Sequence, residues 1–222
     1  VEGNHYYNEA NIRASLTSLH SSHLPDALEI GRNLKQINMN RSKNTRVTLK
    51  KSQDENVEAL ASVGDVSPWR MALFADNTGS RETGKMRAGW NVEYNNLFNL
   101  DHSVSMQAVT SPSHIDQVKV FALNYHAPLY AQHTDIDLSY GYSSVDSFVG
   151  LSSATGASAG QLDLAGSGRS LGVNVTYYLP HQKSGLNQRV MAGLGSRLYT
   201  NKTLFNSVTA SDNRVRSNAF TL

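Results

Sequence analysis

Cysteine is absent from the 222 residues, which excludes disulfides, thiolate metal sites and a cysteine nucleophile. Charged side chains make up only 17% of the chain and hydrophobic ones 39%, and both fractions are low for a soluble enzyme of this length. The formal net charge of +2 gives no field that would attract nucleic acid, so no nucleic-acid partner is predicted. No apolar run approaches the roughly 18 residues of a membrane helix. A membrane segment could therefore only be a strand with alternating hydrophobicity.

Motifs that mark catalytic or metal chemistry are also missing. The sequence holds no Gly-x-Ser-x-Gly elbow and no His-Glu-x-x-His helix, and no helical pattern follows Gly79–Gly84 to make a phosphate loop. His133, Asp135 and Asp137 could be drawn as a metal cluster, since the two aspartates share one strand face. A turn followed by two water-facing carboxylates is the preferred interpretation. We therefore predict no enzyme activity, no metal site and no cofactor.

Residues 1–67 predict a small α+β domain. A helix is predicted over Asn8–Leu19, with Asn8 as its cap and apolar residues on one face. Pro25-Asp26 opens a second helix, and the period then changes to two along strands around Val47 and around Val57–Val63. A further strand is expected before Val1. The apolar helical positions are Ile12, Leu16, Leu19, Ala27, Ile30, Leu34 and Ile37.

One strand of this domain is a candidate binding edge. An unfolded client could add to it by backbone hydrogen bonds, with basic side chains at its border. The alternative is that these charges only protect a free edge from aggregation, and the sequence leaves both possibilities open. The residues of the edge are Arg46, Val47, Thr48, Leu49, Lys50 and Lys51.

From Pro68 onward every periodic segment alternates with period two, which predicts antiparallel strands. Small polar residues alternate with apolar ones and aromatic residues lie towards strand ends, a pattern typical of transmembrane β-barrels. A soluble β-sandwich would also alternate and remains an alternative. The seven predicted strands are Trp69–Ala75, Met86–Tyr94, Val104–Ala108, Phe121–Ala127, Ile136–Tyr142, Leu171–Leu179 and Val190–Leu198.

The strand pattern also predicts two ends and two faces. If residues 1–67 are periplasmic, strand parity places Asn77–Lys85, Thr110–Gln117 and a long connection over Ser143–Arg169 outside the cell. Asn95–His102, Pro128–Thr134 and Pro180–Gln188 then lie on the periplasmic side. The side chains predicted to face a hydrated lumen, where they could pair with one another or line a polar path, are Arg70, Arg87, Asn91, Glu93 and Asp137.

Short motifs, taken in order, resemble one protein family. Residues 1–12 resemble the opening of a POTRA (polypeptide-transport-associated) domain, and residues 67–129 resemble the first barrel strands of two-partner secretion transporters of the ShlB/FhaC/HecB type. The motifs are Val1-Glu2-Gly3-Asn4, Tyr7-Asn8-Glu9-Ala10-Asn11-Ile12, Ser67-Pro68-Trp69-Arg70, Asp76-Asn77-Thr78-Gly79, Gly84, Asn96-Leu97-Phe98, Asp101-His102, Thr110-Ser111-Pro112, Val118-Lys119-Val120-Phe121 and Tyr125-His126-Ala127-Pro128-Leu129.

This resemblance implies a POTRA-like periplasmic domain over 1–67 and the N-terminal part of a bacterial outer-membrane β-barrel, of about seven strands, over 68–222. It implies two partners, namely outer-membrane lipid and a secreted, unfolded exoprotein of the haemolysin or adhesin type. The family's Val-Arg-Gly-Tyr lid-loop motif is not present, and Arg214-Val215-Arg216-Ser217 does not match it. Another POTRA domain, a plug helix and further strands are expected outside this chain. A barrel-assembly insertase and a soluble β-sandwich that binds at the cell surface remain the alternative functions.

Overall fold

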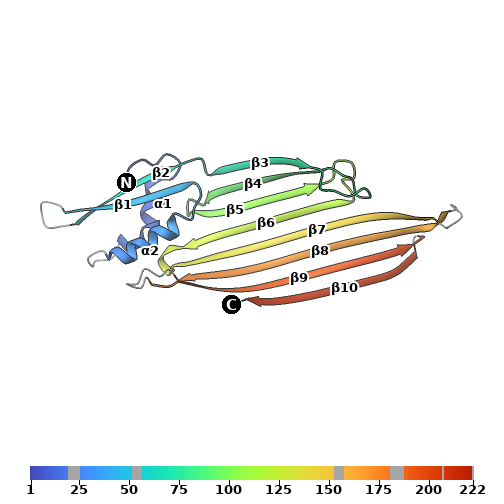
Figure 1. Ribbon diagram of the computed structural model, residues 1–222. Coiled ribbons are helices and arrows are strands. Elements are labelled where there is room, and N and C mark those ends of the chain that lie inside the picture. The colour runs from blue at the N-terminus through green and yellow to red at the C-terminus, as the bar shows by residue number, and fades with distance from the viewer. Residues whose placement is uncertain (20–25, 52–56, 153–157, 181–187, 207, 222) are drawn as a thin grey trace.

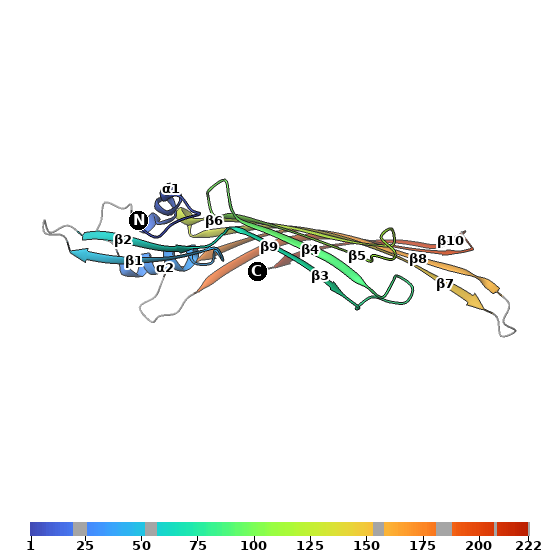
Figure 2. The ribbon, with the colours of Figure 1, turned by 90° about the horizontal axis from the view of Figure 1, so that it is seen from above.

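The computed structural model describes residues 1–19, 26–51, 57–152, 158–180, 188–206 and 208–221, and shows two parts (Figure 1). A small α/β module lies at one end of a long antiparallel sheet, and the sheet is a single curved layer when seen from above (Figure 2). No helix in the described part of the chain is long and apolar enough to cross a membrane.

The described residues of the module, which lies within residues 1–67, form three helical segments and one β-hairpin. α1 (Glu9–Ser15) begins at the predicted cap, because the Asn8 side chain accepts the N–H of Asn11. The observed helix is shorter than the predicted one, since α1 ends at Ser15 and a 3₁₀ turn, η1 (Thr17–Leu19), follows it. α2 (Ala27–Ile37) is capped by Asp26, and the hairpin strands are β1 (Lys43–Lys51) and β2 (Val57–Asp65).

The module has its own apolar core, as the helical and period-two patterns predict. Ile12 and Leu16 of the first helical segment meet Ile37 of α2 and the inward side chains of β2. Glu2 lies on the other side of the hairpin, where it forms an isolated parallel bridge with Ser62 of β2. The six buried core residues are Tyr7, Ile12, Leu16, Ile37, Ala61 and Val63.

The sheet contains eight described strands in simple sequential order from β3 at one edge to β10 at the other. Each strand pairs antiparallel with the next, so the turns alternate between the module end and the far end (Figure 1). This alternation confirms the predicted parity of the turns that the structure describes. Residues 181–187 of the predicted turn Pro180–Gln188, and residues 153–157 of the predicted connection Ser143–Arg169, lie outside the described residues. The strands are β3 (Trp69–Asp76), β4 (Arg87–Leu97), β5 (His102–Thr110), β6 (Val118–Leu129), β7 (Thr134–Ser152), β8 (Ser158–Tyr178), β9 (Arg189–Phe205) and β10 (Val208–Thr221).

Two sequence predictions about the sheet are wrong. The long connection over Ser143–Arg169 is mostly strand, because β7 continues to Ser152 and β8 begins at Ser158. An eighth strand, β10, was not predicted at all. Both errors have the same physical reason: apolar alternation marks a strand that has one apolar face, whereas strand pairing needs only backbone groups. Polar strands that extend beyond an apolar surface therefore carry no periodic signal.

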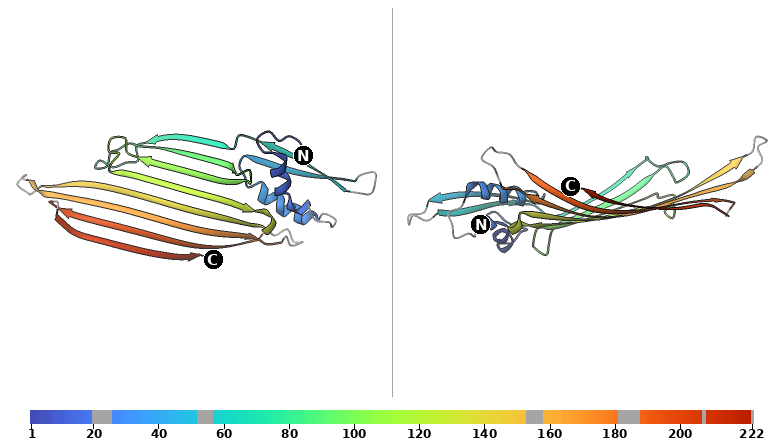
Figure 3. Two further views of the ribbon diagram at one scale, coloured as in Figure 1. Left: turned by 180° about the vertical axis from the view of Figure 1, so that it is seen from behind. Right: turned by 90° about the horizontal axis from the view of Figure 1, so that it is seen from below.

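The two faces of the sheet differ in chemistry. Directly paired residues lie on the same face, so Arg70, Glu93, Ser105, Asn124 and Ser139 form one polar row across β3 to β7. The opposite face carries exposed apolar side chains, with Leu73 at 86% and Met71 at 75% exposed. No described element covers this apolar face, and the sheet is one layer thick throughout (Figure 3).

Candidate functional site

The module docks on the turns at the near end of the sheet. Phe98, Asn99 and Asp101 in the β4–β5 turn have φ of 58°, 57° and 61°, and His133 after η2 (Tyr130–Gln132) has φ of 48°. Left-handed backbone is costly for residues other than glycine, so it persists where surrounding contacts enforce it. Here these turns present carbonyl and carboxylate oxygens to the module.

A fully buried ion pair joins the two parts. The Nζ atom of Lys43, at the start of β1, lies 2.5 Å from Oδ2 of Asp101, and both side chains are 0% exposed. The same ammonium donates to Oδ1 of Asn11 at 3.0 Å, and Asn11 donates to Oδ1 of Asp101 at 2.9 Å. Burial lowers the pKa of Lys43, while the carboxylate of Asp101 acts in the opposite direction. The two charges are thus held together by a closed set of hydrogen bonds.

Two tyrosines complete this network. Tyr130 donates to Oδ2 of Asp101 at 2.6 Å, and burial together with that negative charge raises its pKa. Tyr7 donates to the carbonyl of Asn95 at 3.1 Å, which Asn40 also contacts at 2.9 Å. Burial raises the pKa of Tyr7 to about 12. Both phenols therefore remain protonated donors at neutral pH.

A second polar cluster fixes α2 to β7 and β8. Gln36 donates to Oδ1 of Asp135 at 2.7 Å, and Tyr178 donates to Oδ2 of the same carboxylate at 2.6 Å. The guanidinium of Arg32 lies 5.6 Å from the centroid of the Tyr177 ring. Among the described residues no group of three or more acidic, histidine or cysteine side chains could hold a metal ion. Asp135 accepts one hydrogen bond from the module, through Gln36, and one within the sheet, from Tyr178, and Asp137 pairs with Nδ1 of His126 at 2.7 Å.

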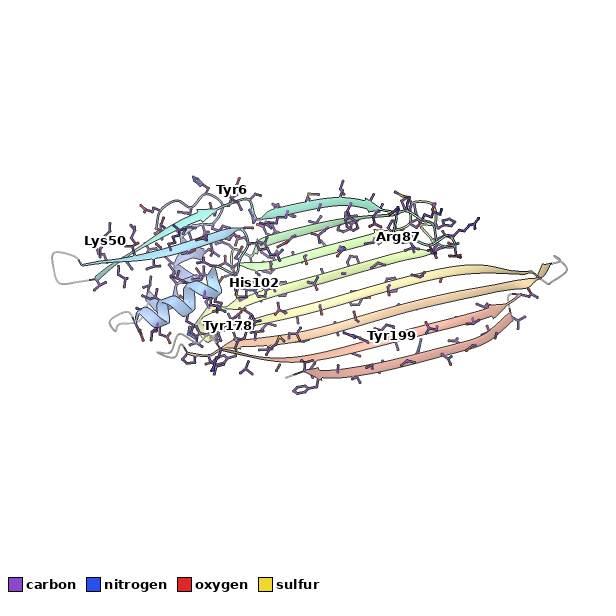
Figure 4. All side chains as sticks on the ribbon, viewed as in Figure 1. Tyr6, Lys50, Arg87, His102, Tyr178 and Tyr199 are labelled. Atoms are coloured by element: carbon purple, nitrogen blue, oxygen red, sulfur yellow. The ribbon has the colours of Figure 1, made fainter. Side chains whose placement is uncertain are left out.

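A polar cavity of about 520 Å³ lies where the module meets the polar face of the sheet. Three of the predicted lumen residues, Asn91, Glu93 and Asp137, line it. Arg70 lies opposite Glu93 in the β3–β4 register and donates to the carbonyl of Arg41 at 3.3 Å. Arg87 shares the face but lies at the far end of the sheet, so it does not reach the cavity (Figure 4). Its guanidinium donates to the carbonyl of Gly84 at 2.6 Å in the β3–β4 turn.

The predicted edge strand is a free edge among the described strands. β1 pairs only with β2. Val63 of β2 donates its N–H to Glu2, on the side away from β1. Because Thr45 lies directly opposite Val63 in the antiparallel register, Thr45 also directs its backbone groups away from β2. Asn38 occupies those groups, since its side chain bonds both the N–H and the carbonyl of Thr45. By alternation, Val47 and Leu49 point their backbone groups out of the same edge, and no described hydrogen bond meets them.

The free edge leads towards the cavity. β1 starts at Lys43 in the junction and runs away from the sheet, so Lys50 lies near the distal tip of the hairpin (Figure 4). Its exposed face carries Arg46, Thr48 and Lys50, whereas Val47 packs against the core. The edge, the cavity and the polar face of the sheet therefore follow one another along the molecule.

Sequence reasoning missed the residues that join the two parts. Lys43, Asn11, Gln36 and Tyr130 were not predicted as interface residues, although Asn11 and Asp101 fall within motifs of the family resemblance. Their polarity resembles that of surface loops, and only the fold brings positions about 58 residues apart, such as Lys43 and Asp101, into contact.

Comparisons with known proteins agree with this geometry. The family model for the haemolysin secretion/activation proteins ShlB/FhaC/HecB matches residues 60–218. CdiB from Escherichia coli superposes with a TM-score of 0.73 at 15% identity, covering 96% of this chain and 39% of its own. CdiB from Acinetobacter baumannii gives a TM-score of 0.62 at 11% identity, covering 99% of this chain and 40% of its own. A search of curated protein sequences finds no match.

Proposed function

Since the chain belongs to the haemolysin secretion/activation protein family ShlB/FhaC/HecB, which consists of outer-membrane β-barrel transporters, we propose that it captures an unfolded exoprotein and passes it across the outer membrane. The family resemblance read from the sequence is confirmed by that match. The chain spans about two fifths of the two CdiB structures, with 39% and 40% of their lengths covered. The activity therefore belongs to a larger assembly, in which residues 1–67 form a POTRA-like periplasmic domain and further strands join β3 to β10.

The observation that carries this proposal is the free edge of β1, which leads into the polar cavity. An extended client can add to β1 through the outward backbone groups of Val47 and Leu49, independently of its sequence. Arg46 and Lys50 border that edge and disfavour basic segments of a client. The client then meets Asn91, Glu93 and Asp137, whose amide and carboxylate groups hydrogen-bond a passing backbone.

The apolar face supports the membrane part of the proposal. Its exposed Leu, Val, Met and aromatic side chains have no protein partner in the described sheet. In lipid, unlike in water, the exposure of apolar side chains carries no free-energy penalty. With the module in the periplasm, the β3–β4 and β5–β6 turns lie at the cell surface.

The test replaces Leu49 by proline. Leu49→Pro removes one outward N–H and leaves the ladder to β2 intact, because this N–H does not point towards β2. The complete protein is co-expressed with the secreted protein encoded beside it, and surface delivery is measured. We expect at least a tenfold loss for Leu49→Pro and no loss for Leu49→Thr, which keeps the N–H.

Equal delivery by both variants would contradict the edge mechanism. Loss of many other outer-membrane barrels on depletion of the protein, with secretion unaffected, would instead identify a barrel-assembly insertase. Extraction of the protein without detergent would identify a soluble β-sandwich.

A further inference from the structure

The far end of the sheet carries basic residues on its apolar face. The register places Lys119, Ser144, Ser167, Thr200 and Arg214 in one row across β6 to β10. The neighbouring row towards the module contains Phe121, Tyr142, Arg169, Leu198 and Arg216. Paired side chains share a face, and Leu171 and Val173 continue the same face of β8. In these two rows the four cations Lys119, Arg169, Arg214 and Arg216 are the charged residues, and the other members are uncharged; we call the four cations the basic belt.

The basic belt lies at the height where a membrane's hydrocarbon ends. On β8 the apolar side chains run from Tyr177 through Val175 and Val173 to Leu171, and Arg169 follows. Eight residues of strand cover about 26 Å, or roughly 20 Å along the membrane normal at a tilt of about 40°. An apolar band of a barrel is about 25 Å tall. The Cα of Arg169 therefore lies just inside the outer limit of such a band, and its long side chain reaches the headgroup layer, where a charge on the outer face costs little.

The cations of the belt are available to a ligand. All four side chains are exposed, and none of the ion pairs found between described residues includes them. The guanidinium of Arg169 lies 5.8 Å from the centroid of the Tyr142 ring, which holds it at the surface without neutralising its charge. The nearest acidic side chains on this face, Asp146 and Asp212, belong to the next row outward, where Asp212 pairs with Lys202 in register.

We propose that the basic belt binds the phosphate groups of a phosphorylated glycolipid in the outer leaflet. The inference rests on the proposed function in one respect, because that function places this face in lipid. Charge complementarity and layout argue for this occupant: the belt spans four strand spacings, about 19 Å, and directly adjoins the apolar band. An amphipathic ligand with several anionic groups above acyl chains matches both surfaces at once. A secreted polypeptide would instead follow the polar face.

Arg197 supplies a matched control for the belt. It lies on β9 beside Leu198, is exposed, and by register shares the polar face with Ser170 and Ser217. A change of Arg197 to glutamine therefore removes the same charge at the same height from the opposite face.

The experiment measures binding of lipid A carrying two phosphates to the complete protein, purified in nonionic detergent. Arg169→Gln/Arg216→Gln should weaken binding about tenfold or more, since each basic side chain at an anionic surface contributes to affinity. Arg197→Gln should leave binding unchanged, and Arg169→Lys/Arg216→Lys should retain most of it. Heat-dependent gel mobility confirms that each variant is folded.

Each outcome bears on one claim. Equal binding by wild type and the double glutamine variant would contradict the proposal that the basic belt binds phosphate groups, even if secretion persists. Binding of dephosphorylated lipid A as strong as that of the bisphosphate would also overturn it, and equal binding of phosphatidylglycerol would overturn the choice of a glycolipid. A protein that is absent from the membrane fraction would sink the proposed function itself, a result that is distinguishable from these.

Discussion

The module and the sheet treat the same kind of side chain in opposite ways. In the module, Ile12 and Ile37 are 0% exposed, whereas Leu73 and Leu194 in the sheet are 86% and 63% exposed. The module has two layers that bury an apolar core between them, and the sheet has one layer with nothing against its apolar face. The same kinds of apolar side chain are thus covered by a partner layer in the module and by no described element in the sheet.

The junction between the module and the sheet differs from both regions, because its buried side chains are polar or charged. Lys43 and Asp101 are both 0% exposed, so removal of one partner leaves a charge buried without compensation. We expect Lys43→Ala to destabilise the complete protein by about 4 kcal/mol, measured by urea unfolding in detergent. The exposed pair of Arg13 and Glu9 is the control, and Arg13→Ala should cost no more than about 0.5 kcal/mol. Similar losses for both variants would remove the distinction between junction and surface.

The difference between the buried apolar side chains of the module and the exposed ones of the sheet gives the next largest effect. Ile12→Ala leaves a cavity in the module and should lower the free energy of unfolding by about 3 kcal/mol. Leu73→Ala, at an exposed position of β3, should change it by less than about 0.5 kcal/mol in detergent. Both values come from the same unfolding measurement. A large loss for Leu73→Ala would mean that another protein layer covers the apolar face.

The effect of an introduced charge on stability distinguishes the two faces of the sheet. Val173 and Asn174 are neighbours on β8 and point to opposite faces. Val173→Arg should destabilise the protein in lipid vesicles by about 2 kcal/mol, while Asn174→Arg, beside the polar cavity, should be nearly neutral. Folding yields into vesicles, compared by heat-dependent gel mobility, measure the difference. The reverse order would show that the polar face contacts lipid.

The smallest effect concerns the attachment of the N-terminal segment to the hairpin. Asp65 accepts the backbone N–H groups of His5, Tyr6 and Tyr7 at 2.8–3.0 Å. Burial acts to raise the pKa of Asp65, but these three donors prevail and the pKa lies below its ordinary value. The stabilisation is therefore present above about pH 4 and is lost as the pH falls through the folded-state pKa. Hydrogen exchange at Tyr6 and Tyr7 should accelerate on acidification, and Asp65→Asn, at a cost of about 1 kcal/mol, should abolish that pH dependence.

Much of the fold could be predicted because the period of apolar residues reports the type of element and which of its sides is apolar. The cap at Asn8, the α2 face, the β1–β2 hairpin and seven strands of the sheet follow from local pattern. β10 and the outer halves of β7 and β8 could not be predicted, since their polar side chains reflect no covered face. Three of the five predicted lumen residues line the cavity, and Arg87 is too far along β4 to join them.

The sequence by itself determined which side chains belong to each face, because alternation along a strand fixes sidedness within every element. It also determined the family, through an ordered series of short motifs, of which those from Ser67 to Leu129 lie within residues 60–218 that the family model matches. Only the tertiary structure decided how the module sits on the sheet, through the contacts of Lys43, Asp101, Gln36 and Asp135. These polar side chains become partners only after docking removes them from water, and no local pattern encodes that event.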